Sequence, residues 1–253
     1  MENKPVNIFW TGGWDSTFRV MQLLIEEKRK VQPHFVVRGQ ASVGKEITTM
    51  IDIRRELFRN YPVTRDLLLP TEYIDVRNII EKQEITNAVN YIKKRQEFAQ
   101  QYDFCSRYCF QNDIDDMEMC IHKDDKAHKL LAPYLENSTW KINGEKTEKG
   151  QKAYDVFQYY RFPLFSMTKL DMKKIAKSCG WLDLLEMTWF CASPYKGKPC
   201  GFCGPCTYVI DEGLSRRLPI YRRIISKIHM PARRIYRNRI KYNRTNFEQA
   251  TGL

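Results

Sequence analysis

The residues best suited to chemistry form a glycine-containing loop, T-G-G-W-D-S-T at positions 11–17. The loop follows a short apolar run, Val6 to Trp10, and precedes apolar residues at helical spacing from Phe18 onward. A strand, a glycine turn and a helix start together make an anion site, because glycines let backbone N–H groups approach an oxyanion and the helix dipole adds positive charge. An ordinary turn is the alternative. The loop hydroxyls that add donors are those of Thr11, Ser16 and Thr17.

Four cysteines crowd into a short C-terminal stretch with the spacing C-x8-C-x2-C-x2-C. Four thiolates this close can close a tetrahedral zinc site, and the intervening glycines and prolines permit the tight turns. The set has no open position, so a structural zinc is favoured over a catalytic one. An iron–sulfur cluster and four free thiols stay open as alternatives. The predicted ligands are Cys191, Cys200, Cys203 and Cys206.

The loop spacing matches neither G-x-x-x-x-G-K-[ST] nor G-x-G-x-x-G. It resembles the S-G-G-x-D-S loop of the PP-loop ATP pyrophosphatases, with Thr11 in the usual serine position. The resemblance implies that the loop holds ATP while a substrate oxygen attacks the α-phosphorus and pyrophosphate leaves. It also implies Mg²⁺, with Asp15 as a candidate for magnesium or ribose contact. The residues to which it gives phosphate binding are Gly12, Gly13, Ser16 and Thr17.

The order of the two motifs is similar to that of the 7-cyano-7-deazaguanine synthases, which serve queuosine biosynthesis. F-P-L-F-S-M-T-K-L-D at 162–171 looks like the family segment P-L-x-x-x-T-K-x-E, and E-M-T-W-F-C at 186–191 looks like x-x-T-W-S-C. V-R-G-Q at 37–40 stands where the family has a Y-G-Q turn, which makes Val37 and Gln40 candidate nucleotide contacts. The match makes Lys169 a candidate for ATP phosphates. The resulting catalytic candidates are Asp15, Ser16 and Lys169.

This resemblance implies an ATP-dependent ligase that adenylates a small carboxylate, such as 7-carboxy-7-deazaguanine, and joins it to ammonia. The match covers roughly residues 6–60 and 160–210. The P-G-R-N-type and Y-P-D-C-R-type segments that shape the family's deazaguanine pocket are absent. Two alternatives therefore stay open, an RNA-modifying PP-loop enzyme and a non-catalytic module that binds ATP and zinc.

The elements that must position these residues alternate between strand and helix over the first 76 residues. Strands are predicted near 6–10, 34–37 and 73–76, with a helix at 46–60. Such alternation indicates a parallel sheet with right-handed crossovers. The predicted fold is a doubly wound α/β sheet, adenine nucleotide α-hydrolase-like, with a C-terminal zinc knot. The predicted domains are a PP-loop domain at 1–190, a zinc segment at 191–212 and a basic extension at 213–253.

The middle of the chain is less regular. Residues 84–110 are predicted to be helical, Met117 to His122 to form a strand, and 136–152 to form a surface loop. A helix is predicted from Thr168, its cap, to Gly180. His122 and His128 flank acidic residues, and a polar loop surface is favoured over a metal or base role. The cysteines outside the cluster are expected to be packing residues: Cys105, Cys109, Cys120 and Cys179.

The net charge of +12 is concentrated at the C-terminus, since residues 213–253 hold eleven Lys or Arg and one acid and so carry +10. Basic residues interleaved with tyrosines suit nucleic acid, while a basic amphipathic helix suits an acidic partner or an anionic membrane. A packed helix with a solvated face is the plain alternative, and a homodimer stays open. Neither a signal peptide nor a membrane span is expected, so the cytoplasm is predicted.

Overall fold

The computed structural model of the protein describes residues 4–136, 140–143, 147–224 and 226. The chain divides into two compact units, Met1–Trp189 and Phe190–Leu253. The three domains expected from the sequence stay a prediction.

The first unit is built on a five-stranded sheet with the order β3-β2-β1-β4-β7, in which every pairing is parallel. β1 is central, and the chain runs from it first to β2 on one side and later to β4 on the other. The direction in which strands are added thus reverses at β1. In sheets of this kind ligands bind at the carboxyl ends of the two strands that flank such a reversal, here β1 and β4. The strands are β1 Val6–Phe9, β2 Val31–Val37, β3 Glu72–Asp75, β4 Met117–Glu118 and β7 Tyr160–Arg161.

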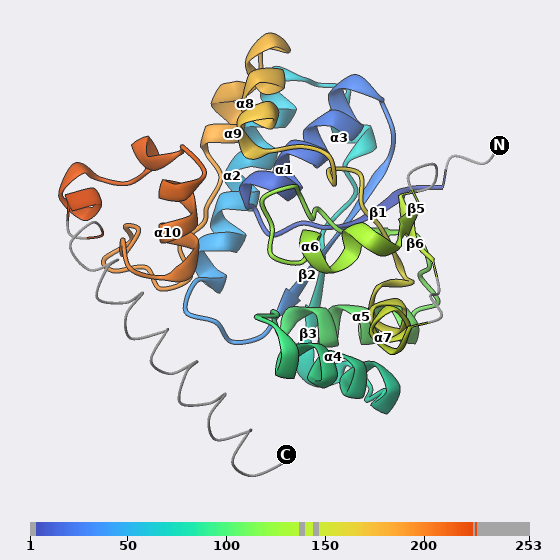
Figure 1. Ribbon diagram of the computed structural model, residues 1–253. Coiled ribbons are helices and arrows are strands. Elements are labelled where there is room, and N and C mark those ends of the chain that lie inside the picture. Colours follow the sequence, from blue (N-terminus) through green and yellow to red (C-terminus); the bar gives the residue numbers. More distant parts are fainter. Residues whose placement is uncertain (1–3, 137–139, 144–146, 225, 227–253) are drawn as a thin grey trace. The chain divides into compact units, whose positions relative to one another are not determined.

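Helices cover both faces of this sheet, so the predicted doubly wound α/β fold is confirmed (Figure 1). On one face α4, α5 and α7 pack together, and on the other α1 contacts α8 and α9, while α2 contacts α3 and α9. The helices are α1 Trp14–Met21, α2 Val43–Asn60, α3 Thr64–Leu67, α4 Gln83–Arg95, α5 Gln101–Gln111, α6 His128–Leu131, α7 Glu148–Phe157, α8 Lys169–Ser178 and α9 Leu182–Glu186. Shorter turns are η1 Gln22–Glu26, η2 Val76–Asn78 and η3 Ala132–Tyr134.

The alternation of side chains along the strands places apolar residues on both faces of the sheet. Phe9 and Val36 belong to the buried cluster with α4, α5 and α7, whereas Ile8 and Phe35, the adjacent residues, are buried outside that cluster. Because successive side chains in a strand point to opposite faces, each central strand buries apolar groups on both sides. The near-continuous apolar runs seen in the sequence have this cause.

Three parts of the middle segment differ from the expectation. The helical region 84–110 is two helices, α4 and α5, and β4 has only two residues. The stretch expected to be a surface loop holds a small antiparallel pair, β5 Leu135–Glu136 with β6 Lys141–Ile142, and the start of α7. α7 was missed because its polar first turn resembles a loop, although Thr147 caps it by accepting a hydrogen bond from Gly150 N.

The helix predicted after Thr168 is confirmed as α8. The Thr168 side chain accepts from Asp171 N, and the Asp171 carboxylate accepts from Thr168 N, which makes a complete capping box. Gly180 follows the helix with φ of 79°, a conformation that favours glycine and ends the helix.

The second unit holds the cysteine segment, followed by α10 Gly204–Asp211 and a short turn, η4 Ser215–Arg217. Most of the predicted basic extension, from 227 onward, lies outside the described residues. Of its first helical turns, Ile220 and Ile224 are exposed. Within the described part of the chain, no helix is long and apolar enough to cross a bilayer.

Candidate active site and metal centre

The glycine loop lies at the carboxyl end of the central strand, where β1 gives way to α1. Gly12 takes φ of +67°, which turns the chain sharply, and Gly13 precedes α1 with no side-chain cap on the helix. The first amides of α1 therefore have no capping side chain, which is the arrangement that binds an anion. Ser16 is buried beneath the loop, and its Oγ accepts a long hydrogen bond of 3.5 Å from Thr11 N.

Thr17 does not face the loop opening. Its side chain is fully buried, and its Oγ1 accepts a 2.9 Å hydrogen bond from the Trp10 indole. The structure thus gives Thr17 a packing role beneath the loop instead of the phosphate contact expected from the sequence. The cause is helical geometry, since Thr17 lies one turn after Gly13 and its N–H already donates to Gly13 O at 3.1 Å.

Three ionisable side chains from different elements converge beside this loop. Asp15 lies in the first turn of α1, His122 lies in the segment after β4, and Lys169 begins α8. Lys169 Nζ is 3.6 Å and His122 Nε2 is 3.8 Å from the same oxygen, Asp15 Oδ2. The other carboxylate oxygen, Asp15 Oδ1, is buried without a hydrogen-bond partner. The sequence-predicted pair Asp15 and Lys169 is therefore brought together, and one oxygen of Asp15 is left to take a cation.

His122 is buried, in contrast to the loop surface expected from the sequence. Its Nδ1 accepts a 3.2 Å hydrogen bond from Asp124 N, so the neutral ring carries its proton on Nε2, the nitrogen nearest Asp15. The burial arises because Lys123 N donates to Met167 O at 2.8 Å, which ties this segment to the one that follows β7. The signal available in the sequence was the position of His122 at the end of the predicted strand that begins at Met117.

Asp125 is a second acid that the sequence did not single out. Its Oδ1 accepts from Ala127 N at 2.8 Å. Burial raises the pKa of Asp125, the negative charge of Asp15 raises it further, and His122 and Lys169 act in the opposite direction. Asp15 and Asp125 thus belong to one electrostatic group at the carboxyl edge of the sheet.

One other segment singled out by the sequence, that of Trp189, borders the loop. Trp189 N donates to Gly12 O at 2.8 Å, and the Lys45 ammonium, unnoticed in the sequence, lies 5.4 Å from the centre of the Trp189 ring. Val37 ends β2 next to β1. Gln40 donates to Glu46 and accepts from Arg38 N, so its amide shapes the turn after β2.

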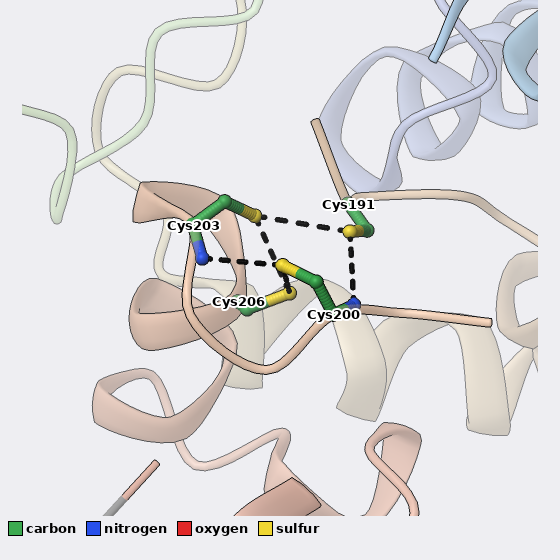
Figure 2. A group of neighbouring side chains, drawn as sticks. All are labelled: Cys191, Cys200, Cys203 and Cys206. Atoms are coloured by element: carbon green, nitrogen blue, oxygen red, sulfur yellow. Dashed lines mark hydrogen bonds between the residues drawn. The ribbon is translucent and has the colours of Figure 1, made fainter. Parts of the chain in front are cut away.

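The four predicted metal ligands lie together in the second unit, with their sulfur atoms all within 4.8 Å of one another (Figure 2). The sulfur of Cys203 is 3.4 Å from that of Cys206 and 3.8 Å from that of Cys191, and the Cys200 and Cys206 sulfurs are 3.9 Å apart. A single ion with metal–sulfur bonds of about 2.3 Å has its tetrahedral ligands about 3.8 Å apart. The donor set therefore fits one tetrahedral metal ion.

Backbone amides support these sulfurs. Cys200 N donates to Cys191 Sγ at 3.2 Å, and Cys203 N donates to Cys200 Sγ at 3.3 Å (Figure 2). Phe202 N also donates to Cys200 Sγ at 3.3 Å. Such hydrogen bonds stabilise thiolates. Gly201 has φ of +83°, a turn conformation that favours glycine. A side chain there would also be crowded, because its Cβ would lie 3.2 Å from the Arg222 backbone oxygen.

The remaining cysteines behave differently from one another. Cys105 and Cys109 are buried on α5, as expected of packing residues, and burial raises the pKa of the Cys105 thiol to about 12. Cys120 is partly buried. Cys179 is exposed at the end of α8, so the packing role expected for it is wrong.

Comparison with known proteins gives little sequence-level similarity: no family model and no curated protein matches the chain. Among solved structures, the U34-tRNA thiolase NcsA from Methanococcus maripaludis, with its [4Fe-4S] cluster, is similar at 14% identity and a TM-score of 0.42. The similarity covers 92% of this chain and 73% of that chain. The likeness to the 7-cyano-7-deazaguanine synthases stays a prediction from motifs.

Proposed function

We propose that this protein is an ATP-dependent enzyme that adenylates its substrate and releases pyrophosphate. The observation that carries the proposal is the convergence of Asp15, His122 and Lys169 beside the uncapped start of α1. One carboxylate, one imidazole and one ammonium lie where the strand order reverses, next to amides that can bind phosphate. These groups can bind a nucleotide and can stabilise the charge that develops as its adenylyl group is transferred.

In the proposed reaction, a substrate oxygen bonds to the α-phosphorus of ATP as the bond to the bridging oxygen of pyrophosphate breaks. The protein's contribution is positioning and neutralisation of charge. The amides at Gly12 and Gly13 and the Ser16 hydroxyl bind phosphate oxygens. The Lys169 ammonium, in the partly buried position beside Asp15, neutralises charge that develops on the departing pyrophosphate.

Two metal ions complete the proposal. Mg²⁺ fits beside Asp15, because the buried and unpartnered Oδ1 is the hard oxygen ligand that this ion prefers. Zn²⁺ fits the four cysteines, because the sulfur separations suit a single tetrahedral ion and leave no open position. The zinc is structural in this proposal and takes no part in the transfer.

RNA is the favoured substrate class, on an observation from the second unit. The guanidinium of Arg222 lies 5.2 to 5.7 Å from the ring centres of Tyr195, Phe202 and Tyr221. All three rings are exposed. From 190 to 224 this unit carries six Lys or Arg against two acids. Exposed rings with cations suit unstacked bases and a phosphate backbone. The adenylated group is then a base oxygen.

A small carboxylate is the second candidate, and the motifs that resemble the 7-cyano-7-deazaguanine synthases favour it. In that case 7-carboxy-7-deazaguanine is adenylated and ammonia displaces AMP. The two substrate classes make different demands on the protein. RNA uses the rings of the second unit, whereas a small carboxylate needs only the glycine-loop site.

The deciding experiment measures pyrophosphate release from MgATP with unmodified tRNA transcripts, and separately with 7-carboxy-7-deazaguanine and ammonium. RNA-dependent release that Lys169→Gln abolishes supports the RNA proposal. Tyr195→Ala with Tyr221→Ala should then raise the KM for RNA, while Tyr73→Ala, at a half-exposed tyrosine of the first unit, should not. Release with the carboxylate alone selects the second candidate. If ATP binds but no pyrophosphate is released in either mixture, the proposal of an adenylating enzyme is refuted.

A further inference from the structure

A pocket opens in the first unit beside the amino ends of β1, β2 and β4. Its cavity has a volume of about 380 Å³ and is bordered by Val6, the first residue of β1, and by Asp116, which precedes β4. Arg29, just before β2, also borders it. The glycine loop follows the opposite end of β1, and four residues of strand span roughly 13 Å. The pocket is therefore separate from the proposed ATP site.

The floor of this pocket is a buried ion pair. Arg19 donates to both oxygens of Glu118, at 2.7 and 2.9 Å, and also contacts Glu27. Burial opposes the charge on Arg19, but the hydrogen bonds and charge of Glu118 and Glu27 outweigh it, and the pKa of Arg19 is raised. This pair links α1 to β4, so it is a fixed and already neutralised part of the wall.

The remaining lining charges are not balanced. Arg29 and Arg161 are exposed and have no ion pair within the described residues. Lys4, also exposed, lies 3.7 Å from Asp116, a distance that leaves this ammonium weakly held. Two planar guanidinium groups facing one cavity can bind a phosphate dianion through paired N–H donors.

An aromatic ring forms a further wall. Trp140 has φ of +54°, a conformation that is costly for a bulky side chain. Two hydrogen bonds hold it there: Phe162 N donates to Trp140 O at 3.0 Å, and Trp140 N donates to Glu136 O at 2.9 Å. The first bond places Trp140 beside the strand that carries Arg161. A tryptophan whose backbone is held in this costly conformation at the edge of a cationic cavity suits stacking on a planar ligand.

We propose that this pocket binds a phosphate monoester that carries a planar ring, the chemistry of a mononucleotide or of the 5′-phosphate end of an RNA. Arg29 and Arg161 hold the phosphate, and Trp140 stacks on the ring. The volume lies within the range of pockets that enclose a molecule of this size. The site does not depend on adenylation at the glycine loop.

The test is calorimetric titration of the full-length protein with GMP while a non-hydrolysable ATP analogue saturates the glycine loop. The matched control for the variants is Arg59→Gln, at an exposed arginine of α2. Arg29→Gln and Arg161→Gln should each weaken GMP binding about tenfold and Trp140→Leu several-fold, and guanosine, which lacks the phosphate, should not bind. A short 5′-phosphorylated RNA that binds more tightly than GMP, with the same loss in the variants, identifies an RNA end as the source; tighter GMP binding identifies the free mononucleotide.

Displacement of GMP by the ATP analogue would overturn the proposal, because GMP would then occupy the glycine loop. Unchanged affinity in the Arg29→Gln, Arg161→Gln double variant would also overturn it, as would failure of both GMP and the phosphorylated RNA to bind the wild-type protein. Since both arginines are exposed, the variants are expected to fold, and thermal unfolding checks this.

Discussion

The two glycines of the loop should respond in opposite ways to the same substitution. Gly12 has φ of +67°, and a Cβ there would lie 3.1 Å from Met50 Cγ and 3.2 Å from the Glu46 backbone oxygen. Gly13 has φ of −79° and ψ of 169°, which alanine adopts freely. A Cβ on Gly13 would meet only the Thr11 hydroxyl at 3.2 Å and Trp189 O at 3.7 Å.

The cost of Gly12→Ala has two parts. The left-handed backbone costs about 1–2 kcal/mol for a residue with a Cβ. The contact with Glu46 adds about 1–3 kcal/mol, because that oxygen belongs to α2 and cannot rotate away. Loss of chain entropy in the unfolded state returns about 0.4–1 kcal/mol. The net loss of stability is about 1–5 kcal/mol, which lowers Tm by roughly 2–20 °C in a unit of this size.

Gly13→Ala should leave stability within about 1 kcal/mol of the wild type, since its backbone is relaxed and the exposed Thr11 hydroxyl can rotate. Its methyl group crowds the amides proposed to bind phosphate, so ATP affinity should fall about tenfold or more. The same substitution thus damages the fold at residue 12 and binding at residue 13.

Urea unfolding followed by tryptophan fluorescence measures the first effect, and titration with a fluorescent ATP analogue measures the second. Equal stability of Gly12→Ala and the wild type would refute the steric argument. Unchanged ATP affinity in Gly13→Ala, with the fold intact, would refute the assignment of the loop as the phosphate site.

Three further predictions concern other residues. Lys169→Gln should lower the rate of pyrophosphate release at least about 100-fold, whereas Lys174→Gln, an exposed lysine on the same helix, should leave the rate unchanged. Elemental analysis of the purified protein should find a bound metal that Cys203→Ser loses and Cys179→Ser retains. Burial lowers the pKa of His34, and Glu72 offsets part of this. Because the folded pKa lies below the unfolded value of 6.5, the stability from neutral His34 is present above pH 6.5 and is lost as pH falls through the folded pKa. His34→Gln should therefore lose less stability than the wild type between pH 7 and 5 in urea titrations; an identical loss would contradict this.

The parts of the fold that the sequence predicts are those with strong local patterns. β1 and the end of β2 are short apolar runs before turns, and α8 has a capping box and is followed by Gly180. β7 has no such signal, since it has only two residues and gains its place by pairing with β4. The hairpin of β5 and β6 is equally short, and its pairing depends on tertiary context that residue spacing does not carry.

The two candidate sites differ in the same way. The cysteine cluster could be predicted because its four ligands lie within sixteen residues and their spacing alone limits how far apart the sulfurs can be. Lys169 was found only through its resemblance to a motif, because 154 residues separate it from Asp15. His122 was missed for the opposite reason: its neighbours in sequence are charged and suggest surface, while its position after β4 decides its burial. In a parallel sheet every strand delivers its following residue to the same edge. Whether a polar residue after a buried strand belongs to the site should therefore be predicted first from the strand order, and only then from the composition of its neighbours in sequence.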